Sequence, residues 1–107
     1  MTRLTLNQYQ EHAKTTAKYP QHSAMEYLAM GLCSEAGEVA GKVKKIIRDN
    51  ASWSAMDLAM EVGDVLWYVS ELCSFLDMEL EEVAQMNLEK LADRAKRGAI
   101  GGSGDNR

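Results

Sequence analysis

Two short segments of the sequence repeat the same arrangement of acidic side chains. Glu35 and Glu38 flank an Ala-Gly step, and Glu61 and Asp64 flank a Val-Gly step. Side chains three positions apart lie side by side on a helix, so each segment presents two carboxylates within one turn. If the two helices pack antiparallel, the four carboxylates converge, and only cations relieve their mutual repulsion. A site made of oxygen atoms alone suits Mg²⁺ or Mn²⁺.

Acidic pairs with this spacing also arise by chance, since 16 of the 107 residues are Asp or Glu. Three features distinguish these two pairs. Glu35 lies within about 20° of Leu28 on the helix, beside its apolar stripe rather than opposite it. Gly37 and Gly63 each lower the stability of a helix by about 1 kcal/mol relative to alanine. Their presence is explained if, for example, backbone or a ligand approaches closely there. One strip of the second helix carries Asp57, Glu61, Asp64 and Tyr68. The alternative is solvated carboxylates on ordinary packed helices.

The type of metal ion limits the reactions that such a site could catalyse. Neither acidic pair is followed by a histidine three positions later, as in di-iron bundles, and this favours a redox-inert divalent cation. Mg²⁺ keeps coordination positions for water and phosphate oxygens, so chemistry on a phosphoanhydride is the leading expectation. No Walker-type loop is present, so a polyphosphate would have to bind through metal ions and side chains.

Basic and polar side chains that could meet the charge of such a substrate occur in two places. Lys45 belongs to a basic group near the end of the first acidic helix, which can also be a solvated end that complements the helix dipole. Asn87, Lys90 and Arg94 share one face of the last helix, where the alternative is pairing with neighbouring acids. Trp53, between the acidic helices, is either a lid over the core or a surface that stacks on a base.

The spacing of apolar residues predicts the elements that position these groups. They recur at intervals of three and four with no β-branched run of period two, so the fold is predicted to be all-α. Thr5 with Gln8, and Ser23 with Glu26, match the capping-box pattern at helix starts. The expected helices span residues 5–19, 23–48, 54–76 and 80–97.

Each acidic helix has an apolar stripe typical of a core face. The stripes are Met25, Leu28, Leu32, Ala36, Val39, Val43 and Ile46 in the first helix, and Leu58, Val62, Val65, Val69, Leu72, Cys73 and Leu76 in the second. Met60 and Trp67 point to the opposite side of the second helix. A helix that is apolar on two sides needs two partners, so we expect Met60 and Trp67 to face another subunit. Alternatively, a terminal segment of the same chain covers them.

Length and composition set the remaining expectations. A chain of 107 residues predicts one core, with a helical domain over residues 1–97 and a Gly-rich tail over residues 98–107 that is flexible in the simplest interpretation. A net charge of -4 at pH 7 argues against general binding to nucleic acid or anionic lipid. The apolar runs are too short to span a membrane, and no secretory signal is recognisable. Cys33 and Cys73 are expected to be small buried hydrophobes in a reducing cytoplasm.

Taken together, these motifs resemble the MazG-type all-α nucleoside triphosphate pyrophosphohydrolases. Glu35, Glu38, Glu61 and Asp64 form the pattern ExxE, 22 residues, ExxD. Other segments follow the family pattern in the same order, and these are Gly31–Val39, Lys44-Lys45 before Arg48, Glu61–Tyr68, and Asn87–Leu91 through Arg94. The tail from Gly102 to Arg107 also has a counterpart in single-domain members.

The resemblance implies a four-helix-type bundle that hydrolyses (deoxy)nucleoside triphosphates to the monophosphate and pyrophosphate, as in nucleotide-pool house-cleaning. Glu35, Glu38, Glu61 and Asp64 would bind Mg²⁺, with Glu38 orienting the attacking water. The candidates for binding the phosphates and the sugar are Tyr68, Asn87, Lys90 and Arg94. Family members assemble as homodimers or dimers of dimers whose helices complete the site, in agreement with a second apolar face.

Two other functions stay open at this stage. The first is a non-catalytic helical interaction protein, with solvated acids and an apolar face that binds a partner. The second is a related pyrophosphohydrolase for another phosphoanhydride, such as a phosphoribosyl nucleotide, which would share the metal site and differ in the pocket.

Overall fold

The described part of the chain folds entirely into helices and turns. The computed structural model describes residues 3–107, so Met1 and Thr2, the first residues of the expected helical domain, lie outside the described residues. The four α-helices are α1 (Leu6–Ala13), α2 (Ala24–Asp49), α3 (Ala55–Phe75) and α4 (Leu80–Lys96), with two 3-10 turns, η1 (Lys14–Thr16) and η2 (Gln21–Ser23), between α1 and α2. No strand occurs within residues 3–107. The all-α prediction is therefore confirmed.

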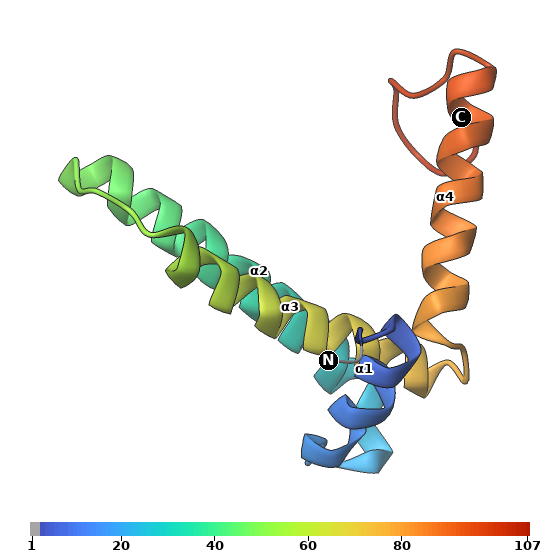
Figure 1. Ribbon diagram of the computed structural model, residues 1–107, viewed down its shortest axis with the longest axis horizontal. Helices are drawn as coiled ribbons and strands as arrows, with labels where there is room; N and C mark the ends of the chain where they lie inside the picture. The colour runs from blue at the N-terminus through green and yellow to red at the C-terminus, as the bar shows by residue number, and fades with distance from the viewer. Residues whose placement is uncertain (1–2) are drawn as a thin grey trace.

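The helices are arranged as a long hairpin with two attachments (Figure 1). α2 and α3 run antiparallel and contact each other along their length, α1 packs near the end of α3, and α4 points away from the hairpin. Each acidic pair thus lies on one arm of an antiparallel hairpin, which is the arrangement that the predicted convergence of the carboxylates requires.

Two of the predicted helix starts are formed as expected, and one is not. The Thr5 hydroxyl accepts a hydrogen bond from the Gln8 amide at 3.1 Å, and the Gln8 side chain accepts one from the Thr5 amide at 2.8 Å. The Ser54 hydroxyl likewise accepts from the Asp57 amide at 3.3 Å. The capping box predicted at Ser23 is wrong, because Ser23 ends a 3-10 turn with φ -129° and ψ 31° and makes no side-chain cap. An N-cap serine needs an extended backbone to place its hydroxyl over the first turn.

The first helix is shorter than predicted. α1 ends at Ala13, and the next residues tighten into η1 instead of continuing to residue 19. The hydroxyls of Thr15 and Thr16 donate to the carbonyls of His12 and Ala13 at 2.7 and 3.0 Å. Such side-chain bonds compete with regular helix formation, which explains the early end.

The core is small and lies where α1 and the neighbouring ends of the other helices meet. Five apolar residues are buried in the described chain, namely Ala13, Ala24, Leu28, Cys73 and Leu80. Only Leu28 and Cys73 come from the predicted stripes, whereas Met25, Val43, Val62 and Leu76 are exposed. The reason is that α2 and α3 cover only each other over most of the hairpin. Cys73 is buried as predicted, but the prediction for Cys33 is wrong because this residue is exposed, and both thiols are free.

The chain is also more open than a compact domain of its length. Its radius of gyration is 16.6 Å, compared with about 13 Å for a compact chain of 100 residues. Its accessible surface is 8064 Å², whereas about 6,000 Å² is typical of a folded monomer of this mass. Much apolar surface therefore stays uncovered, although no described helix has the length and apolar content needed to cross a bilayer.

Met60 and Trp67 differ in their surroundings. Met60 is 66% exposed, so its side of α3 is free to meet a second subunit. Trp67 is half-buried, and its indole N–H donates to the Thr16 hydroxyl at 2.8 Å. For Trp67 the alternative therefore holds, since the N-terminal segment of the same chain contacts it.

Candidate metal centre

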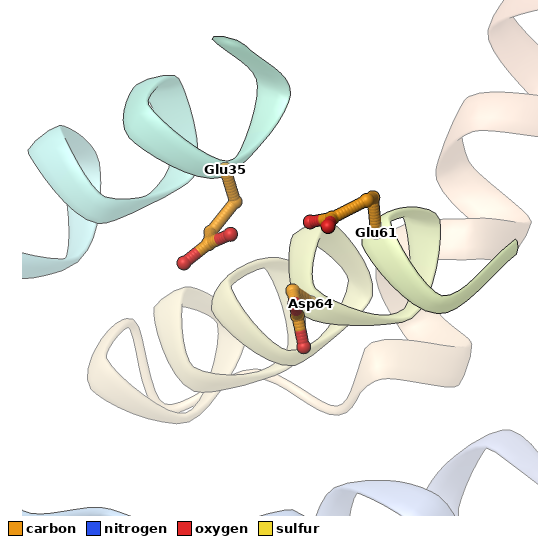
Figure 2. Close-up of side chains that lie close together, drawn as sticks. All are labelled: Glu35, Glu61 and Asp64. Carbon is orange, nitrogen blue, oxygen red and sulfur yellow. The ribbon is translucent and has the colours of Figure 1, made fainter. Parts of the chain in front are cut away.

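Three of the four predicted acidic ligands come together across the hairpin. Glu35 projects from α2, while Glu61 and Asp64 project from adjacent turns of α3, and Glu35 and Glu61 point toward one another (Figure 2). One carboxylate oxygen from each of the three lies within 4.8 Å of the others. Two ligand oxygens on opposite sides of Mg²⁺ are about 4 Å apart, so small side-chain rotations would bring all three into the coordination shell of one ion.

Glu38 occupies a different position from the other three. It lies one turn after Glu35 on α2 and is exposed to solvent, and the group of converging carboxylates does not include it. Its charge nevertheless contributes to the raised pKa of Glu35. Its roles as a ligand and as the group that orients water stay predictions.

The acidic cluster, defined as Glu35, Glu61 and Asp64, is short of positive charge. Desolvation raises the pKa of Glu35, and the charges of Asp64, Glu61 and Glu38 raise it further. The ammonium group of Lys42 lies 3.5 Å from a Glu61 oxygen and offsets part of the negative charge. A divalent cation would supply the remainder, and an all-oxygen donor set fits Mg²⁺ or Mn²⁺.

Tyr68 lies beside the acidic cluster because α2 has a glycine opposite it. A Cβ atom on Gly31 would overlap with the Tyr68 ring, so the ring can pack on the α2 backbone only at this glycine. Desolvation raises the pKa of Tyr68, followed by the effects of Tyr27, Glu35 and Asp64. The close approach expected at Gly37 and Gly63 is not found, since no group from the rest of the described chain lies within 4 Å of a Cβ there. Close approach of backbone from within residues 3–107 is therefore excluded at these two glycines, and close approach of a ligand stays a prediction.

Comparison with known proteins agrees with this geometry. Residues 23–99, which contain the whole acidic cluster, match the MazG nucleotide pyrophosphohydrolase domain. The chain belongs to the MazG nucleotide pyrophosphohydrolase family. It is 48% identical over 109 residues to the Gene 37 protein of Mycobacterium phage L5, an alignment that covers 92% of this chain and 96% of the phage protein. No solved structure matches the chain.

The MazG domain also contains a buried acid that the sequence analysis did not single out. Glu71 is almost completely buried, and one of its carboxylate oxygens accepts a hydrogen bond from the Tyr19 hydroxyl at 3.1 Å. Its other oxygen has no partner within residues 3–107, and neither has the hydroxyl of the adjacent, fully buried Ser70. Desolvation, and then the charges of Asp64 and Glu71, raise the pKa of Tyr9. The helical strip from Asp57 to Tyr68 continues three residues further to Glu71, and this spacing was the available signal.

A cavity near the closed end of the hairpin adjoins the acidic cluster. Its volume is about 420 Å³, and its lining includes Lys42, Lys45, Trp53 and Asp57. Trp53 is 62% exposed, so it does not act as a lid over a core. Because Lys42 contacts Glu61 and also lines the cavity, it connects the two.

The three polar residues of α4 lie elsewhere. Within one chain, α4 packs against α1 and α3 and then points away from the hairpin (Figure 1). Asn87 is exposed, whereas Lys90 and Arg94 both donate hydrogen bonds to Asp105 of the tail. The structure of a single chain therefore does not bring these residues to the acidic cluster.

Proposed function

We propose that this MazG domain catalyses the Mg²⁺-dependent hydrolysis of (deoxy)nucleoside triphosphates to a nucleoside monophosphate and pyrophosphate, and so removes unwanted nucleotides from the pool. The observation that carries the proposal is the convergence of Glu35, Glu61 and Asp64 from two helices within a matched MazG domain. These three residues would hold the ion, with Glu38 as a fourth ligand and Mn²⁺ as an alternative metal.

The reaction assigns separate tasks to the metal and to the chain. When bound, the cation polarises the α-phosphate, lowers the pKa of a water molecule and neutralises charge on the departing group. The water oxygen forms a bond to the α-phosphorus, and the bond from that phosphorus to the oxygen bridging to the β-phosphate breaks. Glu38 accepts the proton of the attacking water, because an exposed carboxylate one turn from Glu35 can reach a group held there.

The cavity at the closed end of the hairpin supports a nucleotide as the substrate. Lys42 and Lys45 offer positive charge to phosphate oxygens, and the exposed indole of Trp53 offers a face on which a planar base stacks. Tyr68, packed beside the cluster, would contact the sugar or the α-phosphate in this proposal. In this proposal Asn87, Lys90 and Arg94 reach a bound nucleotide from a second copy of the chain.

The uncovered surface supports a homodimer, or a dimer of such dimers, as the proposed assembly. The single chain exposes about 2,000 Å² more than a typical monomer of its mass, and large apolar residues such as Met30, Ile47 and Met60 are exposed. This excess is in the range that each subunit of an obligate dimer buries. A monomer mass in solution would contradict the proposed assembly. The free thiols Cys33 and Cys73 are consistent with the proposed cytoplasmic location.

The same exposed apolar surface favours a second candidate, a non-catalytic protein that binds a helical partner. One assay separates the two functions. The protein is incubated with Mg²⁺ and a panel of nucleoside triphosphates and phosphoribosyl nucleotides, and the products are identified. Pyrophosphate plus monophosphate supports the proposed enzyme, orthophosphate plus diphosphate contradicts attack at the α-phosphate, and no turnover of any compound favours the interaction protein. Turnover of phosphoribosyl nucleotides alone would support the proposed metal site but would identify a different substrate.

A further inference from the structure

The C-terminal tail, residues 98–107, forms a closed loop against α4. Gly98 has a φ of 68° and turns the chain back, and the Ala99 amide then donates to the Arg94 carbonyl at 2.7 Å. The Arg107 guanidinium donates to the carbonyls of Ala99 and Ile100 at 3.2 and 3.3 Å, and the Arg97 guanidinium donates to the Arg107 carbonyl at 2.8 Å. These contacts tie the end of the tail to its beginning.

At the centre of this loop, one carboxylate oxygen receives two cationic donors. The Asp105 oxygen accepts from the Lys90 ammonium at 3.0 Å and from the Arg94 guanidinium at 2.9 Å. Arg94 also donates to the Gly104 carbonyl at 3.4 Å. Hydrogen bonds to Lys90 and Arg94, and then their charges, lower the pKa of Asp105. Lys90 and Arg94 therefore form a site that already holds an oxyanion, and this oxyanion belongs to the chain itself.

The two sides of this contact differ in accessibility. The Arg94 side chain is only 5% exposed, whereas that of Asp105 is 80% exposed. The Arg94 guanidinium is therefore shielded from solvent, whereas the Asp105 carboxylate remains hydrated, and its pair with the exposed Lys90 side chain is of the weak, solvent-exposed kind. Gly102 and Gly104, with φ of 91° and 81°, adopt a backbone conformation that favours glycine and gives the tail freedom to move once the pair is broken.

We propose that Asp105 is a built-in competitor for phosphate, so that the tail occupies the Lys90–Arg94 site until a phosphate group of a polyphosphate displaces it. A phosphate oxygen can accept the same two donors as a carboxylate oxygen, and a polyphosphate carries more negative charge than one carboxylate. The identity of the ligand rests on the proposed function, but the competition itself rests on the contacts of the tail. In this proposal the tail controls whether the Lys90 and Arg94 side chains are free to bind a nucleotide that is held at the acidic cluster of a second copy of the chain.

The test measures binding without catalysis. Inorganic pyrophosphate is titrated, in the absence of divalent metal, into the full chain and three variants, Asp105→Asn, Lys90→Gln and Asp93→Asn. Asp93→Asn is the matched control, because it breaks the 2.8 Å pair with Arg97 on the same helix and leaves Asp105 in place. Calorimetry gives the affinity, and the amide signals of residues 101–104 report whether the tail is released.

We expect Asp105→Asn to bind pyrophosphate roughly threefold to tenfold more tightly than the parent chain. Lys90→Gln should bind more weakly, Asp93→Asn should behave like the parent, and the tail signals should sharpen as pyrophosphate saturates the parent. Unchanged or weaker binding by Asp105→Asn would overturn the proposal, and so would a tail that stays attached at saturation. Because no turnover is measured, tail release in a protein that hydrolyses no nucleotide would refute the proposed activity and leave this proposal intact.

Discussion

The hairpin and the C-terminal region differ in how fully their charged side chains are paired. On the α2–α3 hairpin, Glu35, Glu61 and Asp64 converge, and among residues 3–107 the cation in contact with them is the Lys42 ammonium, 3.5 Å from Glu61. On α4, Lys90 and Arg94 both donate hydrogen bonds to Asp105 of the tail. Arg97, directly after the helix, donates to the Asp93 carboxylate and to the Arg107 carbonyl. The hairpin thus keeps an excess of negative charge, whereas the basic groups of α4 are paired with acceptors of the tail and of the helix itself.

The helix junction and the far part of the hairpin differ in how they bury apolar groups. The junction of α1 with the neighbouring helix ends contains the fully buried Leu28, together with Cys73 and Leu80. Further along the hairpin, Ile47 is 76% exposed. Since the free energy of burial scales with the area removed from water, the junction stabilises the single chain, and the hairpin gains most from a ligand or from a second copy.

The largest effect is expected when one negative charge is removed from the acidic cluster of the hairpin. Glu61→Gln keeps the shape of the side chain but removes a ligand charge, and we expect kcat for nucleoside triphosphate hydrolysis to fall by about 100-fold or more, since even outer-shell partners of a metal contribute 10–100-fold. Glu89→Gln, an exposed change on α4, is the matched control and should retain full activity. Steady-state kinetics with unchanged circular dichroism checks both, and normal turnover by Glu61→Gln would refute the assignment of the site.

Metal binding should stabilise the hairpin selectively. At Mg²⁺ concentrations 100 times the dissociation constant, we expect the free energy of unfolding to rise by about 2.7 kcal/mol. Glu61→Gln should lose most of this gain, whereas Asp93→Asn on α4 should keep it. Thermal unfolding with Mg²⁺ or with a chelator measures the effect, and an equal gain in Glu61→Gln would place the ion elsewhere.

Two glycines of α2 should respond to alanine in opposite directions. At Gly31 the new Cβ meets the Tyr68 ring, and overpacking of this kind destabilises by roughly 1–3 kcal/mol. At Gly37 no group from elsewhere in residues 3–107 lies within 4 Å of an added Cβ, so the better helix propensity of alanine should stabilise by about 0.5–1 kcal/mol. Urea unfolding of both variants tests this pair. Loss of stability in Gly37→Ala would instead indicate that a second copy packs against this glycine.

The smallest effects are in the pH dependence, and they have opposite signs in the two regions. The raised pKa of Glu35 means that the metal-free folded chain holds this proton more tightly than the unfolded chain, so stability falls as the pH rises from 4.5 through the folded pKa. The lowered pKa of Asp105 means that its stabilisation is present above pH 3.8 and is lost as the pH falls through the folded pKa. Unfolding from pH 3 to 8, compared among the parent, Glu35→Gln and Asp105→Asn, separates the two contributions. A parent and Glu35→Gln with the same slope above pH 4.5 would contradict the first assignment.

Several features were predictable from the sequence because they depend on neighbouring residues. The all-α fold follows from the spacing of apolar residues, and the Thr5 cap follows from a hydroxyl and an amide three positions apart. The meeting of Glu35 with Glu61 and Asp64 needed only two regular helices and their antiparallel packing. Local geometry is fixed by bonds within a few residues, which is why these expectations held.

Other features were decided only by the tertiary structure. The extent of the core, the burial of Glu71, the packing of Tyr68 on Gly31 and the pairing of Lys90 and Arg94 with Asp105 all depend on which segments meet. The apolar stripe of α2 looked like a core face, but most of it is not buried, because in the described part of the chain α1 and α4 pack against the hairpin only near one end. The sequence by itself therefore determined the helices and the residues that carry the chemistry. Only the placement of those helices decided which charges remain free to bind a ligand, because burial and ion pairing depend on distances between segments that are remote along the chain.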